Sequence, residues 1–387
     1  MSFLTGRISC IRLNVEGQRP RLFDAEFIER LEEFQSGRQK IASSDGVETG
    51  WAAGNHMLDT DFQPAKNIYG DWLCFDLCIT TDKLPSDRFR AYYEVELAAL
   101  AKGNPSGLPS SRQKKEAKEI ARERLEQEAK DGRYRKNKLI PVAWHAVTNR
   151  VYFGATSLTH LDRLISLFQQ TFRCGLNPMA AGEIAHSIGT GRLTQVDDIS
   201  PSAFVPNNGD DIAWIADETS RDFLGNEFLL WLWYTGEAVS DTLKLSDNSE
   251  ATFMLTNKVK LECPRGQTGK DAITHEGPTR LPEAKRAIRA GKLPRSVGMT
   301  VIRQSEQFEF VVAAETLALS GMKVPNPDEN TTEPHARCME RLDKFAFGIE
   351  TLEMMYEYFL TVRLSRQWTD VLKSMQAWLA KGERTIG

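Results

Sequence analysis

The chain has 387 residues, of which 41% are hydrophobic and 26% charged, and its formal net charge is -4. A usual domain takes roughly 100 to 200 residues, so this length leaves room for two or three packed modules, and the average composition indicates neither disorder nor a coiled coil. The negative charge excludes attraction of the whole surface to nucleic acid or anionic lipid, so any contact with DNA must come from segregated basic side chains.

The beginning, MSFLTGRISCIRLNVEG, has no cationic stretch followed by a long apolar run, and the longest apolar clusters, such as residues 228–234, are far shorter than the ~20 residues that cross a bilayer. We therefore expect a cytoplasmic protein without membrane contact. The six cysteines are scattered and show no pair with the two-residue spacing of a zinc site. We expect reduced thiols and no metal.

The first 180 residues predict one α+β module. Its strands alternate polar and apolar residues, and its helices repeat an apolar face every three or four residues. Pro85 suits the first turn of a helix, and Thr148-Asn149-Arg150 suits a bend between two strands. The expected elements are strand 7–15, helix 24–34, strand 71–80, helix 88–101, two strands within 141–154 and helix 158–173.

A charged helical hairpin interrupts this module. Residues 103–111 (GNPSGLPSS) form a loop by composition, and the charged segment that follows reaches Gly132 without an internal proline or glycine. Together with helix 88–101, this segment predicts two long helices. We expect a protruding finger over 83–138, with 1–82 and 139–180 forming the N-terminal module around it.

The second half predicts another α+β module. Residues 177–211 are rich in Gly, Pro, Ser and Asp and only weakly periodic, so we expect a linker or insertion over 181–211 and a C-terminal module over 212–387. The expected fold class is α+β, with two or more α+β modules. The expected elements of this half are helix 221–234, strands near 250–261 and 297–314, a basic helix over 282–290, and two C-terminal helices.

Basic residues are concentrated in the finger. Residues 111–138 hold eleven Lys or Arg against six Asp or Glu, an excess of five. Spacing on a helix puts four cations on one face, a stripe that suits a phosphate backbone, and four more follow it. The alternative is an exposed helix whose charges pair at i,i+4, as with Lys115 and Glu119. The candidate DNA contacts are Arg112, Lys115, Lys118, Arg122, Arg133, Arg135, Lys136 and Lys138.

A second basic region lies in the C-terminal module. Gly266 and Gly269 give it a flexible loop that exposes its backbone, which suits phosphate contacts but equally suits a plain hairpin turn. The candidate DNA contacts here are Lys258, Lys260, Arg265, Lys270, Arg286, Arg289, Lys292 and Arg295.

The sequence gives little support for a catalytic site. A metal-dependent nuclease needs converging carboxylates, and the tight acidic group is expected instead to solvate a loop and cap a helix. The histidines lack an HExxH pairing, residues 189–191 lack the rest of a dinucleotide fingerprint, and no GxxxxGK[ST] occurs, so we expect no catalytic residue, metal or cofactor. His145 is expected to be structural. The acidic group is Asp210, Asp211, Asp217, Glu218 and Glu227.

Aromatic residues gather in the expected helix 221–234. They suit a stacking platform for single strands, but Phe228, Trp231 and Leu232 share one helical face, which favours packing in the core. The run consists of Phe223, Phe228, Trp231, Trp233 and Tyr234.

The order of these elements resembles the recombination-associated RdgC family, most clearly over residues 83–178. In that stretch the family's order is followed by KLPSDRFRAYYEVELAAL, QKKEAKEIARERLEQEAKDGRYRKNKLIP, VAWHAVTNRVYFGATS and DRLISLFQQTF. Weaker similarity covers Gly50-Trp51, LWLWYTGE, NKVKLE, PEAKRAIRAGKLPRSVGMTV and QFEFVV. The chain departs from the family by extra sequence around 177–218 and 323–335, which leaves room for an added partner surface.

The resemblance implies a ring-shaped homodimer that encircles double-stranded DNA and restrains RecA-promoted strand exchange. The charged hairpin would form the tip that closes the ring, and Lys258, Lys260, Arg286, Arg289 and Lys292 would contact phosphates. We therefore expect a nucleoid-associated protein that binds duplex DNA without sequence specificity, modulates homologous recombination and is not an enzyme. The alternatives are a regulator that binds a recombinase or nuclease partner through the same fold, and a metal-dependent exonuclease.

Overall fold

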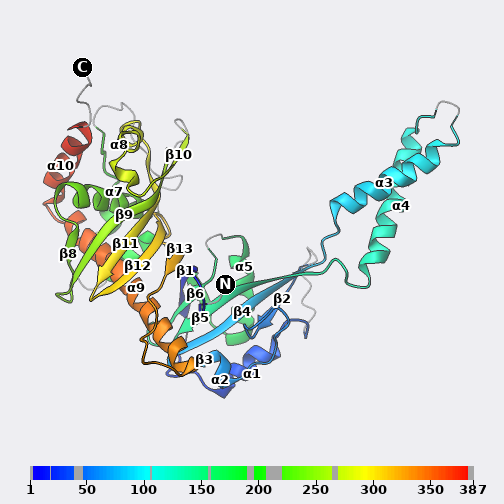
Figure 1. Ribbon diagram of the computed structural model, residues 1–387, viewed down its shortest axis with the longest axis horizontal. Helices are drawn as coiled ribbons and strands as arrows, with labels where there is room; N and C mark the ends of the chain where they lie inside the picture. Colours follow the sequence, from blue (N-terminus) through cyan, green and yellow to red (C-terminus); the bar gives the residue numbers. More distant parts are fainter. Residues whose placement is uncertain are drawn as a thin grey trace. The chain divides into compact units, whose positions relative to one another are not determined.

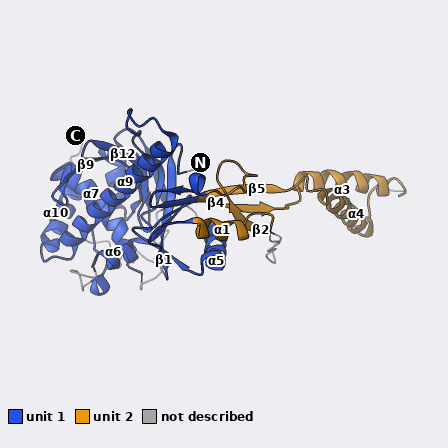
Figure 2. Cartoon of the chain, turned by 90° about the horizontal axis from the view of Figure 1, so that it is seen from below, with its two compact units in different colours: residues 1–24, 64–74, 141–387 blue, residues 25–63, 75–140 orange. Residues whose placement is uncertain are grey.

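The structure of the protein is a computed structural model that describes residues 3–17, 19–38, 47–104, 107–155, 158–189, 196–205, 220–263 and 269–381. Ten α-helices and thirteen strands lie within these residues, and the strand pairs given below are antiparallel, which confirms the α+β class. The chain divides into two compact units (Figure 2). Unit 1 comprises Met1–Asp24, Pro64–Cys74 and Pro141–Gly387, and unit 2 comprises Ala25–Gln63 and Phe75–Ile140.

A long run of antiparallel strands forms the sheet of unit 1 (Figure 1). Alternation gives it an inner and an outer face: in β11, Val297, Met299 and Val301 are buried, whereas Thr300 and Ile302 are at least partly exposed. The strand order is β10 (Lys270–Thr274), β9 (Glu250–Glu262), β11 (Leu293–Arg303), β12 (Glu306–Ala313), β13 (Leu319–Lys323), β1 (Ile8–Glu16) and β6 (Arg150–Phe153). Beside this run, β8 (Thr242–Lys244) pairs with β9, β7 (Gly175–Pro178) with β1, and β3 (Ile68–Tyr69) with β4 (Trp72–Thr81).

Helix α7 (Phe223–Ala238) lies in the core of unit 1. Phe228, Trp231 and Trp233 are buried, so the aromatic run packs in the core and offers no stacking platform. Gly225 permits a close approach, because a Cβ there would lie 1.8 Å from the carbonyl oxygen of Ala314. The other helices of this unit are α2 (Pro64–Asn67), α5 (Leu161–Phe172), α6 (Ala181–Gly189), α8 (Pro282–Arg289), α9 (Pro334–Arg363) and α10 (Trp368–Ala380), with the 3-10 turns Leu158–His160, Val196–Asp198 and Pro278–Arg280.

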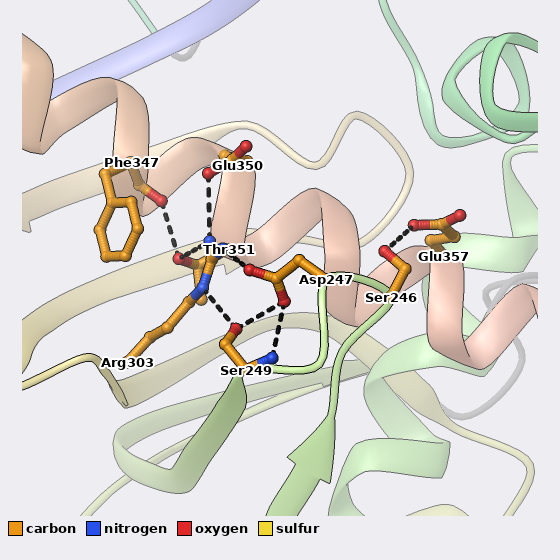
Figure 3. A network of polar contacts seen from close by, with 8 residues as sticks. All are labelled: Ser246, Asp247, Ser249, Arg303, Phe347, Glu350, Thr351 and Glu357. Carbon is orange, nitrogen blue, oxygen red and sulfur yellow. Dashed lines mark hydrogen bonds and ion pairs between the residues drawn. The ribbon is translucent and has the colours of Figure 1, made fainter.

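Arg303, at the end of β11, bonds to residues of α9 and of the turn before β9 (Figure 3). Its guanidinium bonds to Asp247 at 2.6 Å, to Ser249 at 2.9 Å and to Glu350 at 3.1 Å, and its side chain is only 3% exposed. Hydrogen bonds from Ser249, together with the Arg303 ion pair, lower the pKa of Asp247 to about 2. The satisfied charge network therefore joins three elements of unit 1 that are distant in sequence.

Unit 2 combines a small sheet with a pair of long helices. Strand β2 (Val47–Ala52) pairs with β4, and β5 (Lys136–His145) lies next to β4 on its other side; β4 and β5 both continue into unit 1. Trp51 and Phe75 pack edge to face at 4.9 Å, and α1 (Ala25–Glu33) belongs to the same unit. Helices α3 (Ser86–Ala101) and α4 (Ser111–Ala129) pack against each other, as expected for the helical hairpin.

Polar contacts connect α3 with α4, or with the segment that follows α4, at both ends of the helical pair. At the turn, Ser110 caps α4 through Gln113, whose amide also donates to the carbonyl of Leu100 at 2.9 Å. At the other end, Glu128 accepts hydrogen bonds from the hydroxyls of Tyr92 at 2.7 Å and Tyr134 at 2.6 Å, and these bonds lower its pKa. The pair is therefore held as one body.

Most expected elements are confirmed with small shifts of their ends. The structure adds short strands that the sequence did not indicate, among them β2, β7 and β13. It also places α6 within 181–211, the segment expected to link the modules. Within the described ranges, no helix is long and apolar enough to cross a membrane.

Candidate nucleic-acid interface

Helix α4 presents a row of basic side chains. Arg112, Lys115, Lys118 and Arg122 are all exposed and span eleven residues, or about 15 Å of helix, while the buried positions of α4 lie on a different face. Arg122 approaches Glu126 at 3.6 Å, and no ion pair of the other three is found in the described part of the chain. The i,i+4 alternative thus holds for Arg122 alone.

The beginning of α4 places cations where a helix favours anions. The first helical turn carries Arg112 and Lys114 and no acidic residue. The positive end of the helix dipole disfavours such charges by about 0.3–1 kcal/mol each at low ionic strength. A bound polyanion would relieve this repulsion, so the arrangement suits a phosphate backbone better than an isolated helix.

The basic cluster after α4 is partly neutralised. Arg133 bonds to the Asp131 carboxylate through Nε at 2.9 and 3.0 Å and through Nη2 at 2.5 Å, which lowers the pKa of Asp131, and Arg135 pairs with Glu48. The sequence contains no acid between residues 133 and 138, but the fold brings one from β2. Lys136 and Lys138 are exposed and complete the cluster.

The second basic region is divided by the sheet of unit 1. In β9, Val259 and Leu261 point to the inner face, so Lys258 and Lys260 point to the outer one. Helix α8 packs its buried Ala284 and Ile288 on the inner side, near β9. Its exposed arginine, Arg286, therefore lies on the helical side of the sheet, away from the two lysines.

The remaining cations of this region are engaged within the protein. Lys292 is 8% exposed and bonds to Asp271 at 2.6 Å, so it is a buried structural residue. Lys270 pairs with Glu262 at 2.9 Å, and Arg295 pairs with Glu262 at 3.6 Å and with Glu315. Arg289 is half-buried, and Arg265 lies outside the described residues.

Glu227, one of the five acids considered for a nuclease, has a structural role. It is 1% exposed, its Oε2 accepts from Arg363 Nε at 2.5 Å and its Oε1 accepts from the Ser202 amide at 2.6 Å. Arg363 also donates to the Ser200 carbonyl at 2.7 Å, so the pair anchors this segment to α9. No group of three metal-binding side chains occurs where the chain is described, and the other four acids fall outside that part.

His145 is held as a structural residue in β5. Its ring stacks on Trp72 with centroids 4.3 Å apart, and its Nδ1 lies 3.0 Å from the Thr148 hydroxyl. Burial lowers the pKa of His145, so the ring is neutral at physiological pH and adds no charge to a DNA surface.

Two buried carboxylates of unit 2, Asp59 and Asp76, were not identified from the sequence. Asp76 in β4 and Asp59 in the loop between β2 and α2 are each 6% exposed. Burial, reinforced by the neighbouring Asp59 carboxylate, raises the pKa of Asp76 to about 7. The signal was a lone aspartate in the apolar strand WLCFDLCITT. It marks a group that ionises near neutral pH.

The structure is that of a mixed α+β protein in which helix α4 carries an exposed row of basic side chains. No protein-family model matches the chain. The search of curated proteins finds no match either.

Proposed function

We propose that this chain binds double-stranded DNA through its phosphate backbone, without reading the sequence. The observation that carries the proposal is the exposed row of Arg112, Lys115 and Lys118, which have no ion pair in the described part of α4's surroundings. Lysine and arginine rows of this kind release counterions from DNA and bind all sequences with similar affinity. The order of elements that resembles RdgC supports the same assignment.

On this proposal two copies form a ring around the duplex and modulate homologous recombination at the nucleoid by restraining RecA-type strand exchange. The protein acts by binding, without a catalytic residue, metal or cofactor. The helical pair α3–α4 forms the finger of each copy, and its basic row follows the backbone across about 15 Å. Lys136 and Lys138 extend the contact beyond the end of α4.

The triple substitution Arg112→Ala, Lys115→Ala, Lys118→Ala tests this function. With a labelled duplex of random sequence, fluorescence anisotropy at several salt concentrations should show weaker binding for the variant. The slope of log K against log salt should fall by about 0.9 for each lost phosphate contact, or about 2.7 in total. The loss should be the same on unrelated sequences, because phosphates carry no sequence information.

The matched control is Lys244→Ala, Lys323→Ala, Lys373→Ala, which removes three exposed charges elsewhere. It should leave the slope nearly unchanged. Absence of binding by the parent protein at low salt, or binding that does not respond to salt, would refute the proposal. The parent protein is also expected to have the mass of a dimer in solution.

A second candidate function is a regulator that binds a recombinase or nuclease partner. It is favoured by α3, in which no residue is buried and Val95 is 59% exposed. Such an apolar surface suits a protein partner or a second copy. Stoichiometric capture of a recombinase after nuclease treatment, lost in Val95→Asp and kept in the α4 triple variant, would support this function over DNA binding.

A further inference from the structure

The outer face of the unit 1 sheet is open. Helix α7 covers the inner face, since a Cβ on its Gly236 would lie 3.2 Å from the inward ring of Phe253 in β9. On the opposite face, Met254 is 55% and Ile302 42% exposed, and Thr252 and Gln307 are also exposed. The described residues of unit 1 therefore leave this face accessible to a partner.

Two lysines lie side by side at the β10 end of this face. Lys258 is exposed and Lys260 half-buried, and a two-residue step along a strand separates their Cα atoms by about 7 Å. Their cross-strand neighbours are uncharged: Thr274 faces Lys258, and Ala272 and Ser296 face Lys260. Lysines on an edge strand can prevent edge-to-edge aggregation of sheets. Strand β9 is not an edge strand here, because β10 pairs with it, so Lys258 and Lys260 do not have that role.

The charge around these lysines is positive overall. Glu262 interacts with Lys260, Lys270 and Arg295, and the bond from Lys270 is the main cause of its lowered pKa. Arg295 also pairs with Glu315. With Lys258, four cations face two carboxylates, which leaves an excess of two.

Helix α8 lies in the other layer. Its Lys285 bonds to Glu237 of α7 at 2.6 Å and lies 4.6 Å from the ring centroid of Trp378 in α10. These contacts fix α8 among the helices that cover the inner face (Figure 1). A rigid partner that contacts Lys258 and Lys260 on the outer face would thus not reach Arg286 of the same protomer.

We infer that DNA contacts unit 1 on the open outer face of its sheet, through Lys258 and Lys260, and that Arg286 of α8 takes no part. The occupant is the phosphate backbone: two lysine ammonium groups and the exposed hydroxyl of Thr274 supply donors, and the excess positive charge supplies attraction. This inference rests on the proposed function and adds a second contact surface, separate from the row on α4.

The test compares two double variants that remove the same charge. Lys258→Ala, Lys260→Ala removes the outer lysines, and Arg280→Ala, Arg286→Ala removes two exposed cations near the inner layer. Anisotropy titrations on a random-sequence duplex should show a salt slope lower by about 1.8 for the lysine variant and an unchanged slope for the arginine variant. Thermal unfolding should be nearly the same for both and for the parent, because Lys258, Arg280 and Arg286 are exposed and Lys260 is only half-buried.

The outcomes separate this inference from the proposed function. If the parent binds and the α4 triple variant weakens binding, but the lysine variant binds like the parent, only the outer-face contact is refuted. A lower slope in the arginine variant, equal to that of the lysine variant, also refutes it. If the parent does not bind duplex DNA at all, both the proposed function and the outer-face contact are refuted.

Discussion

Glu227→Gln is expected to lower the free energy of unfolding by about 3–5 kcal/mol. The substitution keeps the shape of the side chain but removes the charge that faces Arg363, whose side chain is 7% exposed. A buried guanidinium would then lack a counter-charge, and the bonds that hold the segment from Ser200 to Ser202 would weaken. Urea denaturation followed by circular dichroism measures the loss.

The control for this substitution is Glu250→Gln at the exposed start of β9, which should change stability by less than about 0.5 kcal/mol. Replacing both partners, as in Glu227→Leu with Arg363→Met, should recover part of the loss, because apolar residues of similar volume fill the same space. A loss below 1 kcal/mol in Glu227→Gln would show that the ion pair does not anchor the segment. Mg²⁺ should not change the unfolding of the parent or the variant if Glu227 is structural.

Asp76→Asn is expected to stabilise the protein at alkaline pH. The pKa of Asp76 is raised from 3.8 to about 7 in the folded state, so between these values the folded chain binds more protons than the unfolded chain. Stability from this group is therefore fully present below pH 3.8 and is lost as pH rises to about 7. The loss reaches up to about 4 kcal/mol above pH 7, and asparagine, which cannot ionise, avoids it.

Thermal unfolding from pH 5 to pH 9 checks this expectation. The difference in stability between Asp76→Asn and the parent should grow with pH and level off above pH 8. The control is Asp61→Asn, which removes an exposed carboxyl group from the loop between β2 and α2. A variant that is less stable than the parent at pH 8 would mean that the ionised carboxylate is stabilised by its surroundings.

The helices could be predicted from sequence because their apolar period persists over several turns. The segments found as α4, α7 and α8 were all expected within a few residues of their ends. Short strands such as β7 and β13 have four or five residues and little alternation, and they exist because each pairs with β1. Their pairing is a tertiary effect that no local pattern records.

The candidate interface was harder to predict, because charge pairing depends on residues that are distant in sequence. Arg135 meets Glu48 across 87 positions, and Lys292 meets Asp271 across 21. From the sequence, Lys258 and Arg286 were assigned to one basic region. In the structure, strand alternation places Lys258 on the outer face of the sheet, whereas Arg286 lies on α8 in the helical layer on the other side. What could be predicted was the excess of five positive charges over residues 111–138, four of which come from the segment after Ala129.

The pairing of β1 with β13 sets the order in which the chain can fold during synthesis. Ile8 lies opposite Met322, so β1 waits for more than 300 further residues before it gains this neighbour. At about 5–20 residues per second the wait is roughly 15–60 s. Every residue of unit 2 is made by position 140, so its sheet and helical pair can form while the first strand of unit 1 still lacks β13.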